Sequence, residues 1–271
     1  MVLEFAGGLL TNSLALLSDA GHMLNDAAAL ALSLFALKLS GKAADARKSY
    51  GYHRFEILAA LANGAALFVI AIVIVKEAWG RLFAPPEVDG GTMTLIAAAG
   101  LAANLAAAWV LLRNSDVKHN VNIRSAFLHV AGDALGSVGA IAAGAMMAWF
   151  GWYLADPIAS VFVSLLILRG AWSVTRQAVH ILMEGTPAAI DLADVRRTLE
   201  AIDGVRNVHD LHVWTITPGM DSLSAHLLIE DGRDEQAVLQ EALTAMETRF
   251  GIEHCTIQIE TNRLKHAALK V

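Results

Sequence analysis

Two long uncharged stretches of apolar residues constrain this 271-residue chain more than any other feature. One runs from 57 to 75 and the other from 90 to 112, and neither contains Lys, Arg, Asp or Glu. As a helix, which rises about 1.5 Å per residue, each can cross a hydrocarbon core about 30 Å thick. Only 17% of the residues are charged, and the mean hydropathy is +0.51. We therefore predict an integral membrane protein.

Further apolar segments extend this pattern to a bundle of six membrane helices. The expected helices cover 1–10, 13–39, 53–82, 91–112, 124–150 and 156–183. The first is too short to span a bilayer, which takes about 20 residues. We interpret it as the second half of a helix that begins before this sequence. A short segment lying at the membrane interface is the alternative.

Positive charge predicts how these helices are oriented. The connections 41–54 and 113–124 are rich in Lys and Arg, whereas the intervening loop 84–91 carries only acidic charge. Loops rich in Lys and Arg stay in the cytoplasm. Six spans with those two loops inside place both termini in the cytoplasm, and we expect a multi-pass protein of the cell (inner) membrane.

The charge balance changes near residue 184. Up to Glu184 the chain holds 12 Lys and Arg and 12 Asp and Glu, whereas from Gly185 it holds 8 and 14, which is the whole net charge of −6. We therefore predict a transmembrane domain over 1–184 and an acidic cytoplasmic domain over 185–271. An acidic domain argues against binding nucleic acid. The only cysteine, Cys255, cannot form an internal disulfide.

The acidic segment has the pattern of a small α+β domain. Helical spacing is expected over 191–204 and 234–250, and β-rich runs over 208–217, 222–230 and 253–261. The sequence PGMDS between the first two runs indicates a hairpin. The order αββαβ predicts a two-layer sandwich of the ferredoxin-like kind.

Ionisable side chains inside two expected membrane helices are the strongest functional signal. His22 and Asp26 lie four residues apart, on one helix face, and His129 and Asp133 repeat this spacing. Ionisable groups in a bilayer are costly and usually face a cavity or a partner. Two imidazoles and two carboxylates make a set of four nitrogen and oxygen donors, the number that tetrahedral zinc prefers. Without a thiolate ligand, such a site should release its metal more readily than a site that includes cysteine.

A structural role for these residues is the alternative, because a single histidine in a membrane helix usually makes a packing hydrogen bond. Two copies of the pattern, each midway along an expected span, favour the metal-site interpretation. Asp19 and Asn25 lie near the same helix face. We expect both to support or pack around the site rather than to bind the metal.

Several long motifs resemble the cation diffusion facilitator family along essentially the whole chain. They are SLALLSDAGHMLNDAAALALSL, YGYHRFEILAALANG, HVAGDALGS, DLHVW and SAHLLIED, in this order. The resemblance implies a homodimeric exporter of divalent metals coupled to protons, with a metallochaperone-like cytoplasmic domain. It also implies that His22, Asp26, His129 and Asp133 form the transport site. The two HxxxD pairs resemble the zinc-preferring branch of the family.

The resemblance implies a second group of metal ligands in the cytoplasmic domain, at or near the dimer interface. These ligands are His209, His226, His254 and Glu260. Strand parity places His254 and Glu260 on one face. The alternative is that these are solvated surface side chains. His212 and Cys255 are weaker candidates.

Two other features follow from comparison with the family pattern. Some relatives bind metal in the loop between the second and third helices, but here Asp45 and His53 form no cluster, so we expect no full site. Relatives also use an ion pair near the cytoplasmic surface to hold helices together. Arg54 and Glu184 are the candidates for this pair, and interfacial charges that reach toward water are the alternative.

The sequence therefore predicts a transporter in a lipid bilayer rather than an enzyme. Its expected cargo is Zn²⁺, with Co²⁺ and Cd²⁺ as further candidates, exchanged for protons. A ligating histidine must be neutral and a ligating carboxylate ionised, so metal and protons compete for one site. The alternatives are an intramembrane zinc hydrolase, for which no HExxH motif is present, and a membrane metal sensor without transport.

Overall fold

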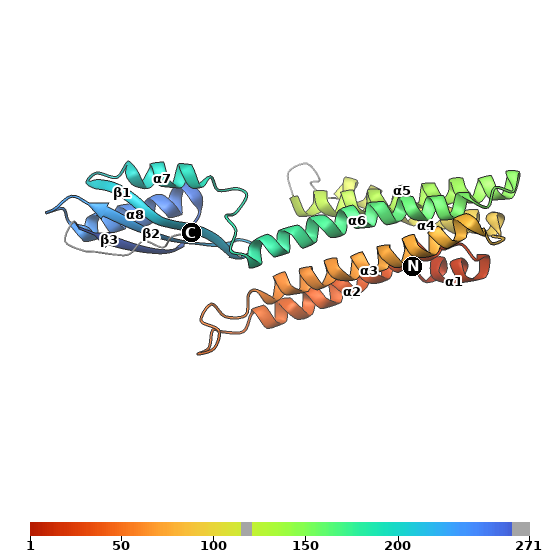
Figure 1. The fold of residues 1–271 in the computed structure, drawn as a ribbon, viewed down its shortest axis with the longest axis horizontal. Coiled ribbons are helices and arrows are strands. Elements are labelled where there is room, and N and C mark those ends of the chain that lie inside the picture. Colours follow the sequence, from red (N-terminus) through yellow and green to blue (C-terminus); the bar gives the residue numbers. More distant parts are fainter. Residues whose placement is uncertain (115–120, 262–271) are drawn as a thin grey trace. The chain divides into compact units, whose positions relative to one another are not determined.

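The computed structural model describes residues 1–114 and 121–261 (Figure 1). The helices are α1 (Val2–Thr11), α2 (Leu14–Ser40), α3 (Phe55–Phe83), α4 (Gly90–Asn114), α5 (Val121–Phe150), α6 (Ala155–Leu182), α7 (Leu192–Glu200) and α8 (Glu235–Phe250). The strands are β1 (Val205–Thr217), β2 (Met220–Ile229) and β3 (His254–Glu260). The chain forms two compact units. Residues 1–32 and 62–175 form the first, and 33–61 with the chain from Arg176 onward form the second.

Five helices, α2 to α6, are long and apolar enough to cross a membrane within the part of the chain that the structure describes. α1 is a shorter apolar helix of 10 residues. The predicted class, an α-helical membrane protein with a small α+β domain, is confirmed. α5 begins at Val121, three residues before the predicted start. Lys118, part of the predicted basic connection, lies outside the described residues.

Small residues let the membrane helices of the first unit approach closely. α4 packs along α5, and α1 packs against α4. A Cβ atom on Gly90 would lie 2.5 Å from the carbonyl oxygen of Gly144, so this contact between α4 and α5 leaves no room for a side chain. Membrane helices commonly associate through such small residues. Ala15 and Leu16 of α2 are buried in the same cluster, which brings α2 against this helix pair.

The first turn of α2 is capped by a carboxylate from α6, far away in the sequence. Asp156 is fully buried and accepts hydrogen bonds from Ser13 Oγ at 2.6 Å, Leu14 N at 2.9 Å and Ala15 N at 3.2 Å. Arg81 Nη1 of α3 lies 3.7 Å from the same carboxylate. Negative charge at a helix N-terminus also opposes the helix dipole favourably. One end of α2 is therefore fixed to α6 and α3.

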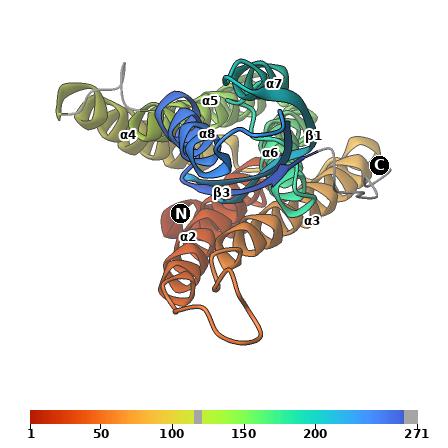
Figure 2. The same cartoon turned by 90° about the vertical axis from the view of Figure 1, so that its left-hand side faces the viewer.

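The α+β part of the second unit is a three-stranded sheet with two helices on one face (Figure 2). β1 and β2 are antiparallel neighbours, and β2 and β3 are parallel neighbours joined through α8. Parallel pairing requires such a long crossover connection. Inward side chains of the strands and the buried faces of α7 and α8 form one apolar cluster. The opposite face, which we call the open face, carries polar side chains, and Tyr50 from the segment between α2 and α3 lies against one of them, His254.

The predicted hairpin is tighter than its sequence suggested. β1 ends at Thr217 and β2 begins at Met220, so only Pro218 and Gly219 form the turn. Gly219 has φ +84°, a conformation that costs glycine little. Met220 and Asp221, assigned to the turn by sequence, therefore belong to β2 and pair with β1.

Candidate metal sites

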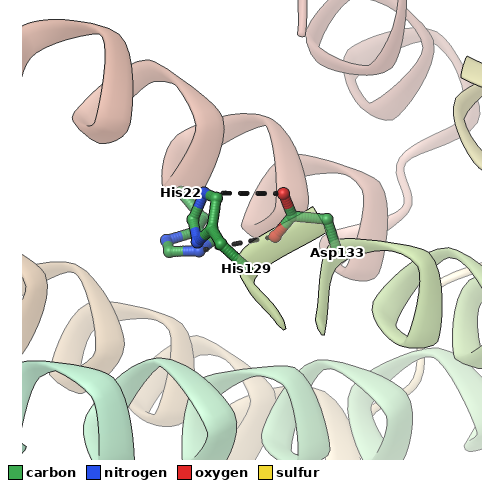
Figure 3. A group of neighbouring side chains, drawn as sticks. All are labelled: His22, His129 and Asp133. Carbon is green, nitrogen blue, oxygen red and sulfur yellow. Dashed lines mark ion pairs between the residues drawn. The ribbon is translucent and has the colours of Figure 1, made fainter. Parts of the chain in front are cut away.

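His22 and Asp26 of α2 meet His129 and Asp133 of α5 inside the first unit. His22 Nε2 lies 3.6 Å from Asp26 Oδ2 and 3.8 Å from Asp133 Oδ1. His129 Nε2 lies 3.3 Å from Asp26 Oδ2 and 3.6 Å from Asp133 Oδ2. Figure 3 shows both imidazoles turned toward the Asp133 carboxylate. His22, His129 and Asp133 each place one donor atom within 4.8 Å of the others, and Asp26 lies beside both imidazoles at the edge of this group.

The spacings at His22 suit a metal ion better than direct hydrogen bonds. Separations of 3.6 and 3.8 Å between His22 Nε2 and the two carboxylates exceed hydrogen-bond length. With metal–ligand bonds of about 2.0–2.1 Å, two donors of a tetrahedral zinc site lie about 3.3–3.4 Å apart. His22, His129 and Asp133 are near that spacing, whereas Asp26 lies outside their 4.8 Å group and would have to move further to join the same ion. The site is therefore compatible with zinc in geometry and in donor type.

Two polar residues near the candidate ligands contact neighbouring helices. Asn25 Nδ2 donates to Asn63 Oδ1 at 2.8 Å and so joins α2 to α3. Asp19 is buried beside Gly136 of α5. Both residues thus contact the helices that neighbour α2, and their supporting role at the site stays a prediction. His22 Nδ1 is buried and has no hydrogen-bond partner among the described residues, so no neighbouring side chain fixes which nitrogen of this ring carries the proton.

A second group of donors lies on the open face of the sheet. Glu260 Oε2 lies 3.2 Å from His209 Nε2, and Glu260 Oε1 lies 2.9 Å from His226 Nδ1. The Glu260 residue is only 5% exposed, and Gln258 Nε2 donates to its Oε1 at 2.9 Å. One atom from each of the three side chains fits within 4.8 Å of the others. Strands β1, β2 and β3 each contribute one member to this His209–His226–Glu260 cluster.

The structure does not bring His254 to this cluster, although the resemblance grouped them. His254 shares a face with Glu260 but precedes it by six residues, which is about 20 Å along a strand. Its ring instead lies 5.8 Å from that of Tyr50, edge to face. Parity alone predicted the common face and could not predict proximity. Asp210, which the sequence pattern did not single out, lies closer, with Oδ2 3.9 Å from His226 Nδ1.

The two weaker candidates also lie outside the His209–His226–Glu260 group of donors. His212 is exposed on β1 and pairs with Ser224. Cys255 points toward the apolar cluster of the sheet, where its thiol donates to the Ile252 carbonyl at 3.4 Å. Burial raises the pKa of the Cys255 thiol to about 11, which disfavours the thiolate that binds metals.

This burial predicts slow chemistry at Cys255. At pH 8 a thiol with a pKa of about 11 is ionised about 100-fold less than one with the usual pKa near 9. Because Cys255 is the only cysteine, its reaction with a thiol-specific reagent can be followed without substitutions. We expect alkylation about 100-fold slower than that of a free cysteine peptide, and a rate unaffected by zinc. Fast alkylation that zinc suppresses would make Cys255 a ligand after all.

The loop between α2 and α3 uses its acidic side chain for folding. Asp45 Oδ1 accepts from Arg47 N at 2.7 Å and from Lys48 N at 2.9 Å, and Tyr52 Oη donates to Asp45 Oδ2 at 2.7 Å. The Tyr52 hydrogen bond holds the pKa of the Asp45 carboxyl below its usual range. His53 does not join it in a group of donors among the described residues. The Asp45 carboxylate is therefore engaged by hydrogen bonds within the loop itself.

Arg54 and Glu184, the expected ion pair, do meet. Arg54 Nη2 lies 3.3 Å from Glu184 Oε1, with side chains 37% and 64% exposed. An ion pair so open to solvent contributes little to stability, typically about 0–1 kcal/mol. The ion pair therefore forms, but it is not a major source of stability.

Comparison with known proteins identifies two matching family regions and many relatives. Residues 1–183 match the cation efflux transmembrane domain, and residues 187–262 match the cytoplasmic domain of cation efflux proteins. A cadmium, cobalt and zinc/H(+)-K(+) antiporter of Bacillus subtilis is 48% identical over 98% of this chain and 86% of its own length. The zinc transporter ZitB of Escherichia coli is 45% identical over 96% of this chain and 83% of its own.

A solved structure of one part of a further relative also matches. It is the metal-bound C-terminal domain of the CzcD transporter from Cupriavidus metallidurans. It is 38% identical, covers 26% of this chain and 99% of its own, and superposes with a TM-score of 0.26.

Proposed function

Because this chain belongs to the cation diffusion facilitator family, a family of multi-pass divalent-metal exporters, we propose that its cargo is Zn²⁺ and that it exchanges this ion for protons. Co²⁺ and Cd²⁺ are further candidates. The relatives named as zinc transporters or as antiporters for cadmium, cobalt and zinc support this choice. The observation that carries the proposal is the convergence of two imidazoles and two carboxylates between α2 and α5.

The four donors explain how metal and protons can use one site. His22 and His129 bind a metal only when their ring nitrogens are unprotonated, and Asp26 and Asp133 bind it best as carboxylates. Protons that arrive on these groups therefore displace the metal. Imidazole changes its charge between about pH 5 and 8, within the range that a cellular proton gradient covers. We propose that metal loads from the cytoplasm and that protons release it on the other side.

The same four donors disfavour the hydrolase alternative. Catalytic zinc sites use three protein ligands and keep the fourth position for water. Here a fourth protein carboxylate, Asp26, lies beside the two imidazoles and is available for the position that a hydrolase keeps for water. The sequence also has no HExxH motif to supply a general base. A sensor without transport uses the same donors, so only a flux measurement separates it.

Architecture completes the proposal. We propose a transmembrane domain over 1–184, a cytoplasmic domain over 185–271, a homodimer, and location in the inner membrane of a bacterial-type cell. The match of residues 187–262 to the cytoplasmic, dimerising domain of cation efflux proteins supports the dimer. The exposed apolar side chains on α2 to α6 supply a surface for lipid.

We also propose that His209, His226 and Glu260 bind a metal in the cytoplasmic domain. Two histidines and a carboxylate are common zinc ligands, and the three donor atoms lie within reach of one ion. Without metal, the buried Glu260 carboxylate is held by the same histidines. His254 is left out of this site because of its distance along β3.

Flux across vesicles tests the transport proposal. The purified chain is reconstituted in proteoliposomes, and the uptake of Zn²⁺, Co²⁺, Cd²⁺ and Mn²⁺ is followed with an acidic lumen and again after an ionophore collapses the pH gradient. We expect zinc to accumulate fastest and to slow when the gradient is removed. Accumulation that ignores the gradient would indicate an uncoupled carrier, and binding without any flux would indicate a sensor.

A further inference from the structure

Asp210 occupies an unusual backbone position next to the His209–His226–Glu260 cluster. In the ladder between β1 and β2, His209 pairs with His226 and His212 pairs with Ser224. Two residues of β1, Asp210 and Leu211, therefore lie opposite one residue of β2, which is a β-bulge. The bulge keeps Leu211 in the apolar cluster while His209 stays on the open face.

The bulge forces Asp210 into the left-handed region, with φ +47°. Glycine is the usual residue in a bulge that needs this conformation, because a Cβ atom makes it costly. Bulges near functional sites often redirect a side chain, and backbone strain concentrates at such sites. A carboxylate retained in a position that suits glycine therefore indicates a functional role for Asp210.

The Asp210 carboxylate points to the metal cluster rather than to solvent. Its side chain is 15% exposed, and Oδ2 lies 3.9 Å from His226 Nδ1. His226 Nδ1 is in turn 2.9 Å from Glu260 Oε1. Two carboxylates thus approach the same imidazole nitrogen, at a place where His209 brings a second imidazole. Such a set offers four nitrogen and oxygen donors, enough to fill a tetrahedral zinc shell.

We infer that Asp210 is the fourth ligand of the cytoplasmic metal site, placed there by the bulge. This inference rests on the metal site proposed at His209, His226 and Glu260. On metal binding, the Asp210 carboxylate oxygen would move toward the ion from its present position beside His226. The left-handed conformation of Asp210 is then retained because it aims a ligand that an ordinary strand position would turn to the opposite face.

The test measures metal binding by the full-length chain in detergent, with Asp26→Ala and Asp133→Ala removing the membrane site. Co²⁺ serves as a spectroscopic substitute for zinc, because its visible absorption reports four-coordinate geometry. Loss of an outer partner of a metal ligand already weakens binding by about 10–100-fold. We therefore expect Asp210→Asn to weaken Co²⁺ binding by about 100-fold or more and to change the spectrum. Asparagine tolerates the left-handed region, so metal-free thermal unfolding should be unchanged.

Three further variants decide how the result is interpreted. Asp210→Gly should weaken Co²⁺ binding equally while raising the unfolding temperature of the metal-free chain, because glycine relieves the strain. Asp221→Asn is the matched control, since the Asp221 carboxylate on the same hairpin accepts from Thr215 Oγ1 at 2.6 Å, and it should bind like the parent. If Glu260→Gln abolishes binding while Asp210→Asn binds normally, the inference about Asp210 is wrong and the site stands. If neither variant affects binding, the cytoplasmic site itself is wrong. Equal losses in Asp210→Asn and Asp221→Asn would reduce the effect to general charge and also overturn the inference.

Discussion

His22→Ala is expected to abolish zinc transport, with a loss of about 100-fold or more relative to the parent chain. The substitution removes one of four donors, a larger change than the loss of an outer partner, which costs about 10–100-fold in metal affinity. Asp133→Ala should have a similar effect, because His22 and Asp133 face each other across α2 and α5 at 3.8 Å. The measurement is zinc flux into proteoliposomes, normalised to the amount of folded protein.

Controls separate a ligand from a packing residue. His180→Ala removes a histidine from α6 whose Nε2 lies 2.9 Å from the Thr186 carbonyl oxygen and which is not among the candidate donors, so it should transport zinc normally. If His22 served packing alone, His22→Ala would lower the yield of folded protein and leave the flux per folded molecule unchanged. Normal zinc flux in that variant would end the transport-site proposal.

His22→Asp extends the same argument to selectivity. It exchanges an imidazole nitrogen for a harder carboxylate oxygen while keeping four donors. Harder oxygen ligands favour Mn²⁺ and similar ions over Zn²⁺. The variant should therefore lose its zinc preference and keep some flux of harder ions, which His22→Ala should not do. A variant that stayed zinc-selective would show that the imidazole does not set selectivity.

Local pattern was sufficient for most of the fold and for the membrane donors. Uncharged runs of about 20 residues have few structural options apart from a membrane helix. A spacing of four residues is enough to place His22 with Asp26, and His129 with Asp133, on common helix faces. Only the pairing of α2 with α5 required tertiary information, and the rarity of ionisable groups in a bilayer made a shared site the natural expectation.

The cytoplasmic cluster was harder to predict because it depends on strand register. Strict alternation in β1 would place His209 and His212 on opposite faces, since they are three residues apart. The bulge at Asp210 adds one residue, so both turn away from the apolar cluster that holds Val208 and Leu211. A bulge without glycine leaves little trace in a sequence. The sequence HDLH contained Asp210, but its alternation gave no reason to select it.

Asp156 was missed as a structural residue for a similar reason. Its partners, Ser13, Leu14 and Ala15, precede it by more than 140 residues, and no spacing rule connects them. Its hydrogen bonds hold the N-terminal end of α2, and His22 and Asp26 lie further along the same helix. The carboxylate satisfies two backbone N–H groups in the first turn of α2 and one hydroxyl, in a place that water does not reach.

Asp156→Ala should therefore destabilise the membrane unit by about 3–5 kcal/mol, the range for removing one partner of a buried charged pair. The substitution leaves the Leu14 and Ala15 N–H groups without an acceptor and Arg81 without a buried counter-charge. Asp156→Asn keeps an acceptor oxygen and should lose less stability.

The matched control is Asp89→Asn, because Asp89 also accepts at a helix N-terminus, from Thr92 N at 3.1 Å and Thr92 Oγ1 at 2.6 Å, but is exposed to solvent. A local cap of that kind is worth about 0.5–2 kcal/mol. Thermal unfolding in detergent, followed by circular dichroism, should show the largest loss of stability for Asp156→Ala, a smaller loss for Asp156→Asn and the smallest for Asp89→Asn. Equal stability of Asp156→Ala and Asp89→Asn would show that the link between α6 and α2 contributes no more than an ordinary helix cap.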